Sequence, residues 1–356
     1  MLYKDFVKSI EILGPYEIQP IIAIGVSGGI DSLALAFLAN EWIRTINGTI
    51  IALTVNHNLR IEATEEAKAV GIILQANGIE HRVLDWQHDK ITSNIQELAR
   101  EARIRLLTQW CQQKNVLHLM MAHHAQDQAE TVLMQMCRGS GVNGLSGMSA
   151  VNIVNKVRVL RPLLNVPKSQ LKRALLKYSD SWIEDLSNSN PKFMRSVARQ
   201  ALKSKSLLQL VNVKQNKQEM LIMRFSLLSY NLGRARACIE KISAQNMAMI
   251  VKIYPQGYLL IDYNGLLKLQ EEIALNILAS CLTTISLHHT KRPRFHSILR
   301  IWEQLKLEQS KFFTLWGCII KANRNKNVIE ICPERQKNNN ISFLPAIALA
   351  QKQFDY

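Results

Sequence analysis

Apolar and polar positions alternate in a regular order along the first half of this chain. Short β-branched runs, which are typical of buried strands, are separated by longer stretches in which apolar residues have helical spacing. The first predicted strand begins at residue 21, and the next three cover 49–55, 80–84 and 116–121. The predicted helices cover 62–75, 94–111 and 126–137. This alternation predicts a parallel sheet covered by helices on both faces, with ligands bound at the carboxyl ends of its strands.

The second half of the chain has a less regular pattern. It predicts a short strand pair over 151–160 and a helix opened by a proline over 167–178. A basic helical stretch over 195–217 and a mixture of strands and helices over 220–333 follow. At 356 residues the chain is too long for one ordinary core. We therefore expect an N-terminal α/β domain over 1–205 and a basic helical linker over 206–222. A smaller α+β domain over 223–335 and a weakly structured tail over 336–356 should follow.

The first strand ends in a glycine pair and the chain restarts as a helix, in the segment Ser27-Gly28-Gly29-Ile30-Asp31-Ser32. Glycines let the backbone approach an anion closely, and a helix that opens at Asp31 or Ser32 directs free N–H groups at that anion. The segment lacks the lysine of the G-x-x-x-x-G-K-[ST] loop and is not G-x-G-x-x-G, so neither common nucleotide motif fits. We predict a phosphate-binding loop; an ordinary glycine-rich turn is the alternative.

Charge is unevenly divided along the chain. Residues 1–150 carry 12 basic and 15 acidic side chains, a net charge of −3, whereas residues 151–356 carry 32 and 13, a net charge of +19. A basic second part joined to a phosphate-binding first part favours a polyanionic partner, most simply nucleic acid. A solvated basic face is the alternative.

Other classes of protein fit the sequence poorly. We find no uncharged apolar run near 18 residues, and the polar N-terminus does not resemble a secretory signal. The six cysteines are widely spaced, which argues against a disulfide framework or a zinc site. We therefore expect a cytoplasmic protein that does not cross a membrane.

Several further motifs follow the glycine loop in a fixed order. They cover Val55–Arg60, Asn94–Arg103, His123–Thr131, Arg138–Leu145, Arg161–Leu164 and Trp182–Asn188. The loop resembles the S-G-G-x-D-S loop of N-type ATP pyrophosphatases, the PP-loop superfamily. The whole series, over about the first two hundred residues, resembles the tRNA(Ile)-lysidine synthetase family, and a collinear series is more specific than any one motif.

The resemblance implies both a fold and a reaction. The fold is an adenine-nucleotide α-hydrolase-like parallel sheet with a helical linker and a smaller mixed C-terminal domain. The reaction is a carbon–nitrogen ligation in which ATP adenylates O2 of the wobble cytidine in the CAU anticodon of tRNA(Ile), and L-lysine then displaces AMP from C2. The product changes codon recognition from AUG to AUA. ATP and Mg²⁺ are the implied small ligands, and a homodimer is possible.

The glycine loop is the expected ATP site, with Ser27, Gly28, Gly29, Ile30, Asp31 and Ser32 as its binding residues. Backbone donors hold the phosphates, because the α–β bond of ATP must be cut to make a leaving group of the cytidine oxygen. Asp31 is suited to hold Mg²⁺, which prefers oxygen ligands. Helix capping is the alternative role for Asp31.

Two carboxylates lie one turn apart on the helix that follows His124, at Asp127 and Glu130. That pair suits an ammonium group or a metal, and the resemblance implies recognition of lysine; a solvated pair of acids is the alternative. His123 and His124 either act on reacting groups or cap the helix. We assign catalysis to Asp31, Asp127, His124 and Arg103.

Arginines and lysines supply the predicted tRNA contacts. Arg100 and Arg103 share one helical face and suit a phosphate, and the resemblance places Arg195 and Arg199 near the active site. Exposed arginines that are merely solvated are the alternative. The predicted tRNA-binding residues are Arg100, Arg195, Arg199, Lys291, Arg292, Arg294 and Arg300.

The chain departs from the family pattern at five positions. The family usually has Asp where this chain has Asn56, Gln126 and Asn190. It usually has Gly in place of Asn58 and Asn in place of Ser196. Three of these changes remove a carboxylate, although an amide still accepts a hydrogen bond. We expect an active enzyme of reduced efficiency at most.

Two other functions share the same motifs. A PP-loop tRNA 2-thiolase adenylates a base in the same way but needs reactive cysteines, and Cys111 and Cys137 lie within predicted helices without a basic environment. A tRNA-binding protein with an impaired nucleotide site is the second alternative, and the lost carboxylates are its best support.

Overall fold

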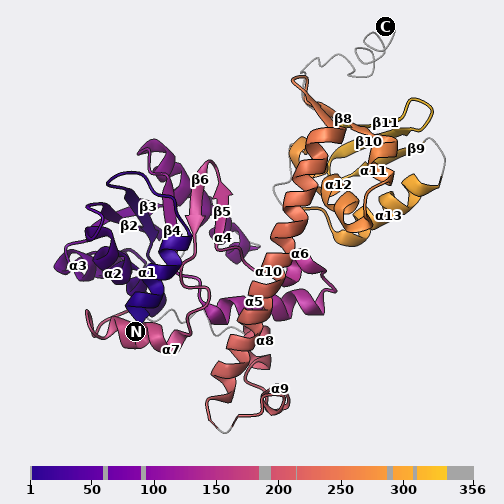
Figure 1. Ribbon diagram of the computed structural model, residues 1–356. Coiled ribbons are helices and arrows are strands. Elements are labelled where there is room, and N and C mark those ends of the chain that lie inside the picture. Colours follow the sequence, from indigo (N-terminus) through magenta and orange to yellow (C-terminus); the bar gives the residue numbers. More distant parts are fainter. Residues whose placement is uncertain are drawn as a thin grey trace. The chain divides into compact units, whose positions relative to one another are not determined.

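The computed structural model describes residues 2–58, 63–89, 94–183, 194–213, 215–286, 292–307 and 311–334. The chain divides into two units, of which the first runs to Gly233 and the second begins at Arg234. The division falls within one long helix, α10 (Lys217–Ile250), drawn in orange in Figure 1. The linker predicted over 206–222 includes the start of that helix, and the predicted domain boundaries stay a prediction.

A six-stranded sheet forms the centre of the first unit, with strand order β3-β2-β1-β4-β6-β5. Every neighbouring pair is parallel except β5 and β6, which form the antiparallel pair predicted over 151–160. The strands are β1 (Ile21–Gly25), β2 (Thr49–Asn56), β3 (Glu80–Asp85), β4 (His118–Met121), β5 (Val151–Val154) and β6 (Val157–Leu160). The carboxyl ends of β1, β2 and β4 therefore lie side by side.

Helices cover both faces of this sheet, as the alternating pattern predicts (Figure 1). On one face, α1 (Leu2–Ile12), α2 (Ile30–Arg44), α3 (Ala63–Ala76) and α7 (Lys168–Leu175) pack around alternate β1 residues such as Ile22 and Ile24. On the other face, α4 (Ile95–Gln113) packs against Ala23 and its neighbours. The central strand β1 is thus buried from both sides, which is why it is almost wholly apolar.

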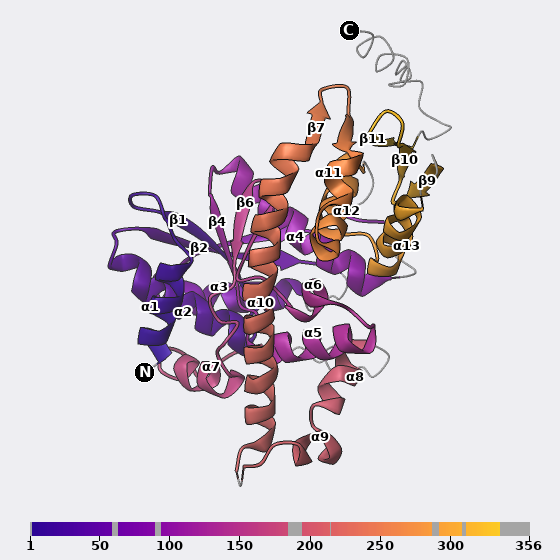
Figure 2. The same ribbon diagram turned by 45° about the vertical axis from the view of Figure 1, so that its right-hand side comes forward.

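The first unit also contains a second group of helices (Figure 2). These helices share a smaller apolar cluster. Its members come from α5 (Ala125–Cys137), from the region of α8 (Met194–Ala201) and α9 (Lys205–Gln209), and from the start of α10. Ala125 and Ala129 of α5 share this cluster with Leu202 and Leu221. The basic stretch predicted as helical is thus broken into short helices, and a short helix, α6 (Val142–Leu145), lies within the motif Arg138–Leu145.

The second unit is a five-stranded antiparallel sheet packed with helices, in the strand order β7-β8-β11-β10-β9. Its elements are β7 (Val251–Tyr254), β8 (Tyr258–Asp262), α11 (Tyr263–Leu267), α12 (Glu271–Ile285), α13 (Phe295–Lys306), β9 (Lys311–Leu315), β10 (Cys318–Asn323) and β11 (Val328–Pro333). The predicted fold class, a mainly parallel α/β domain with a smaller α+β domain, is confirmed. The tail predicted over 336–356 lies outside the described residues.

None of the helices in the described part of the chain combines the length and the apolar character that crossing a bilayer requires.

Candidate active site

The glycine loop connects β1 directly to α2, and its backbone conformation depends on glycine. Gly28 has φ +84°, and a Cβ there would lie 2.6 Å from Val70 and 2.9 Å from Ile183, so both conformation and space require glycine. Gly29 is the N-cap of α2 and has no side chain to satisfy the first N–H groups. Helix α2 begins at Ile30, slightly before the predicted start, and its free N–H groups suit an anion.

The two serines of the loop bond to each other and to its backbone. The Ser32 hydroxyl donates to the Gly29 carbonyl at 3.0 Å and accepts from the Ser27 amide at 3.1 Å. Ser32 is buried, whereas Ser27 is exposed and lies 3.3 Å from the Ser32 hydroxyl. Ser32 therefore shapes the loop, and Ser27 is the serine that faces solvent.

Asp31 has one engaged and one unsatisfied carboxylate oxygen. Its Oδ2 lies 3.3 Å from His124 Nε2 and 3.6 Å from Lys168 Nζ. Its Oδ1 is buried and has no hydrogen-bond partner among the residues that the structure describes. A buried anionic oxygen beside a phosphate-type loop fits a hard cation such as Mg²⁺. The described residues contain no cluster of three or more metal-binding side chains.

His124 is the N-cap of α5 and also contacts the glycine loop. Its Nδ1 accepts from the Gln126 amide at 3.2 Å, while its own amide donates to Asp127 Oδ2 at 3.0 Å. Burial disfavours the charged ring, but the hydrogen bond to Asp31 and the carboxylates of Asp127 and Asp31 together raise the His124 pKa. This residue predicted as catalytic therefore orients Asp31 and Asp127 relative to each other.

His123 differs from its neighbour, because it is held neutral. Burial lowers its pKa to about 3, and the nearby charges of Arg161, Arg103 and Arg195 act in the same direction against the opposing effect of Asp127. Its Nδ1 is buried without a partner in the described part of the chain. At neutral pH, His123 offers a polar but uncharged group beside Asp127.

Glu130 is fully buried and its charge is neutralised by arginines from α8. Arg199 Nε donates to its Oε1 at 2.8 Å, and Arg195 Nε lies 3.4 Å from its Oε2. Gln126 Nε2 donates to the same Oε1 at 3.0 Å. Hydrogen bonding to Glu130 raises the Arg199 pKa. Both oxygens of the predicted lysine ligand are therefore engaged by the protein itself.

Asp127 is the more available of the two predicted lysine ligands. Its Oδ1 lies 3.8 Å from Arg195 Nη2, which is a weaker contact than those of Glu130. Burial would raise the Asp127 pKa, but the histidines His124 and His123 and Arg195 lower it below its usual range. Asp127 therefore stays ionised and can attract a cation.

An excess of guanidinium groups lies next to these carboxylates. Arg103 and Arg161 each have a buried Nε without a hydrogen-bond partner among the described residues, while Arg100 is exposed on α4. Burial, followed by repulsion from Arg100 and Arg195, lowers the Arg103 pKa. Burial and Arg100 also lower the Arg161 pKa, to about 10. This arrangement suits a bound anion, which would relieve the repulsion.

The sequence prediction did not assign roles to Arg161 and Lys168. Arg161 directly follows β6, so its place at the carboxyl end of a strand was a usable signal. Lys168 is the first residue of α7, and its nearness to Asp31 depends on the packing of α7 on α2. No local pattern indicates such a contact between residues 137 positions apart.

Comparisons with known proteins agree with this geometry. The family model of the PP-loop domain matches residues 2–206. The tRNA(Ile)-lysidine synthase of Orientia tsutsugamushi (strain Boryong) is 37% identical over 318 residues, which cover 89% of this chain and 71% of that protein. The synthase of Wolbachia sp. subsp. Brugia malayi (strain TRS) is also 37% identical and covers 84% of this chain and 68% of its own length. This chain belongs to the tRNA(Ile)-lysidine synthase family.

Among solved structures, the U34-tRNA thiolase NcsA from Methanococcus maripaludis with its [4Fe-4S] cluster has a similar fold. The TM-score is 0.50 at 21% identity, over 64% of this chain and 79% of that one. A likeness at that identity indicates a shared PP-loop fold, and the lysidine synthase family assignment rests on the sequence relatives.

Two departures from the lysidine synthase pattern have local explanations. Asn56 is buried, and its amide donates to Asp85 Oδ1 at 3.0 Å, so a carboxylate at this position would be repelled by Asp85. Gln126 likewise donates to buried Glu130. Each amide thus donates to a neighbouring carboxylate. Asn190 lies outside the described residues, and Ser196 is on α8.

The predicted tRNA contacts of the second unit differ in their surroundings. Arg292 Nη2 donates to Asn276 Oδ1 at 2.9 Å and to Ser280 at 3.3 Å, which ties Arg292 to α12. Arg294 and Arg300 are exposed at the start and in the middle of α13. Lys291 lies outside the described residues. All three arginines are exposed, and Arg292 differs in being hydrogen-bonded to α12.

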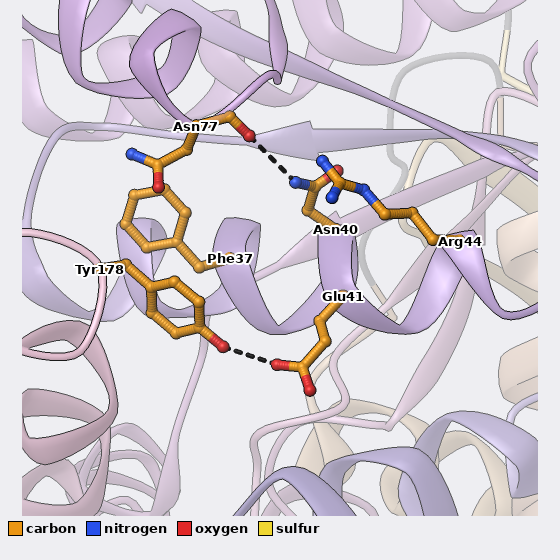
Figure 3. A pocket seen from close by; sticks show the side chains of 6 residues that line it. All are labelled: Phe37, Asn40, Glu41, Arg44, Asn77 and Tyr178. Atoms are coloured by element: carbon orange, nitrogen blue, oxygen red, sulfur yellow. Dashed lines mark hydrogen bonds between the residues drawn. The ribbon is translucent and has the colours of Figure 1, made fainter.

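A pocket of about 240 Å³ lies away from the glycine loop, beside the second half of α2. Figure 3 shows Phe37 and Tyr178 stacked at its wall, with the Tyr178 hydroxyl donating to Glu41. The glycine loop is at the opposite end of α2, so this pocket is separate from the candidate active site.

Proposed function

We propose that this protein ligates L-lysine to C2 of the wobble cytidine, position 34, in the CAU anticodon of tRNA(Ile). ATP is the co-substrate and is cleaved to AMP and pyrophosphate. The observation that carries the proposal is the meeting of the glycine loop, the unsatisfied Asp31 oxygen and the α5 carboxylates at one edge of the sheet, in a chain of the lysidine synthase family.

In the first step, O2 of the cytidine forms a bond to the α-phosphorus of ATP. The bond between that phosphorus and the bridging oxygen breaks, and pyrophosphate leaves with the bonding electron pair. The free N–H groups of Gly29 and the first turn of α2 hold the phosphates, and Arg103 offsets their charge. Mg²⁺, held by Asp31 Oδ1, would shield the phosphate charge.

In the second step, the side-chain amine of lysine forms a bond to C2. For this the ammonium group first loses a proton to water, which frees the lone pair of the nitrogen. The bond between C2 and the adenylate oxygen breaks, AMP leaves with the electron pair, and the nitrogen now bonded to C2 gives a second proton to water. Asp127 attracts the incoming ammonium group, since its own contact to Arg195 is long at 3.8 Å. Neutral His123 does not compete with the ammonium for that carboxylate. Glu130 holds the arginines of α8 beside Asp127.

The reaction is tested with purified full-length protein, ATP, labelled lysine and a tRNA(Ile) transcript with a CAU anticodon. We expect lysine to enter the RNA with release of AMP in equal amount, and a transcript with uridine at position 34 to remain unlabelled. Binding of the tRNA without AMP release or lysine incorporation would support the alternative of an impaired nucleotide site.

Sulfur delivery is disfavoured by the environment of Cys111, which packs with strands of the first-unit sheet. Burial raises the pKa of Cys111 to about 12, so its thiol is not ionised at neutral pH and is a poor nucleophile. Cys137 is exposed at the end of α5. A thiolase would instead incorporate sulfur and show no dependence on lysine.

Three further features complete the proposal. The second unit contributes tRNA contacts through exposed basic side chains such as Arg294 and Arg300. The protein works in the cytoplasm, where tRNA, ATP and lysine occur together. The homodimer stays a prediction of the resemblance, which light scattering on the purified protein tests directly.

A further inference from the structure

Three helices of the first unit begin close to Asp31. Asp31 lies in the first turn of α2, and its Oδ2 contacts both His124, the N-cap of α5, and Lys168, the first residue of α7. The Ala125 amide donates to the Val166 carbonyl at 3.1 Å, which joins the start of α5 to the segment before α7. The positive ends of three helix dipoles therefore face one region, next to a glycine loop suited to phosphate.

Lys168 combines a backbone held by core packing with a half-exposed charged group. Leu171 and Leu175 of α7 are fully buried in the same core as α2, so the position of the Lys168 backbone is set by packing. Its side chain is 51% exposed, and the ammonium lies 3.6 Å from the Asp31 carboxylate. An ion pair that is long and half exposed contributes little to stability and is easily exchanged.

We propose that Lys168 binds the phosphate chain of ATP and stabilises the leaving pyrophosphate. The glycine loop itself has no lysine, unlike the G-x-x-x-x-G-K-[ST] loop, and α7 would supply that charge from 137 residues further along the chain. A phosphate chain carries several negative charges, so it attracts the ammonium more strongly than one carboxylate does. The inference rests on the proposed function, because it takes ATP as the ligand of the loop.

The timing of charge development explains why a lysine is useful here. As the bond between the α-phosphorus and the bridging oxygen breaks, negative charge accumulates on pyrophosphate. The Lys168 ammonium group, which lies near the loop, attracts the pyrophosphate as its negative charge grows, whereas the Asp31 carboxylate repels the pyrophosphate. Lys168 therefore acts on the adenylation step, with contributions to both ATP binding and the rate of bond breakage.

A purely structural role is the alternative explanation. On that view, Lys168 only pairs with Asp31 and holds α7 on α2. However, α7 is already anchored by Leu171 and Leu175, and the pair is long and exposed. The two roles predict different results for ATP binding, which allows a direct test.

The test compares Lys168→Ala, Lys168→Arg and the matched control Lys177→Ala, which removes an exposed lysine just beyond the end of α7. ATP affinity and inhibition by inorganic pyrophosphate are measured by titration calorimetry and steady-state rates, and tRNA affinity by filter binding. We expect Lys168→Ala to lower kcat/KM for ATP about 100-fold and to weaken pyrophosphate inhibition, with unchanged tRNA affinity and thermal midpoint. Lys168→Arg should recover part of the ATP affinity, and Lys177→Ala should match the wild type.

The outcomes separate this inference from the proposed function. If the wild type binds ATP and forms product, and Lys168→Ala equals Lys177→Ala in ATP and pyrophosphate affinity, the inference on Lys168 is wrong while the proposed function stands. A loss of thermal stability in Lys168→Ala without a change in ATP affinity also overturns it. A wild type that binds no ATP overturns the proposed function and this inference together.

Discussion

Glu130 is the residue that determines the charge balance of the site. Its carboxylate has no exposed surface, so its charge is tolerable only because Arg199, Arg195 and Gln126 surround it. The sequence indicated a pair of acids one turn apart at Asp127 and Glu130, and the structure places both at the sheet edge. The engagement of Glu130 by arginines almost seventy residues away has no local signal, because it depends on the packing of α8 against α5.

Removing one of these arginines tests that balance. We expect Arg199→Ala to lower the free energy of unfolding by about 2 kcal/mol, because a buried carboxylate loses its best charged hydrogen bond while Arg195 and Gln126 remain. Urea unfolding of the full chain measures the change. The control Arg224→Ala, at an exposed position of α10, should stay close to the wild type. A double variant with Glu130→Gln should be less destabilised than the sum of the single changes, and additive effects would contradict the pairing.

At the scale of elements, the predictable features are those set by hydrophobic period. The strands and helices of the first unit follow their apolar patterns, so β1, β2, β3 and α2 to α5 could be predicted to within a few residues. The contacts of α7 with α2 and of α8 with α5 could not, because both join elements far apart in sequence. The dual role of His124, as cap and as partner of Asp31, likewise needs the adjacency of β1 and β4.

The edge strand β3 carries a histidine whose titration is coupled to folding. Burial lowers the pKa of His81, and its Nε2 lies 2.8 Å from the Thr54 hydroxyl of β2. Below about pH 6.5 the unfolded chain therefore binds a proton that the folded chain resists, so stability falls as the pH falls.

Urea unfolding at pH 7.5 and pH 5.5 should show that loss of stability. His81→Gln should reduce the difference between the two pH values, because it removes one group that titrates differently in the folded and unfolded states. The control His296→Gln changes an exposed histidine of α13 and should leave the difference as it is in the wild type. An unchanged pH dependence in His81→Gln would contradict the assigned cause.

At the scale of the whole molecule, charge and nucleotide chemistry are divided along the chain. The net charge of −3 over residues 1–150 contrasts with +19 over residues 151–356. The sequence predicted this division and the two classes of fold. It did not indicate which of the basic residues are engaged by the protein itself: Arg292, Arg294 and Arg300 are all exposed, and Arg292 is also hydrogen-bonded to α12.

The exposed arginines of α13 should therefore contribute to tRNA binding. We expect the double variant Arg294→Ala, Arg300→Ala to weaken tRNA affinity and to reduce the slope of log affinity against log salt by about 2, one for each lost phosphate contact. Filter binding across a salt series measures both effects. Lys4→Ala, an exposed change in α1, is the control and should keep the wild-type slope. A double variant with the wild-type slope would show that this face is only solvated.

Nucleoside mapping of the product RNA shows whether lysine is ligated to one cytidine. CAU-anticodon tRNA(Ile) is incubated with the protein, ATP and lysine, digested, and its anticodon fragment is analysed by mass spectrometry. We predict that cytidine 34 alone gains the mass of lysine less water, and only when both ATP and lysine are present. An unmodified cytidine 34, or one that carries sulfur, would contradict the account.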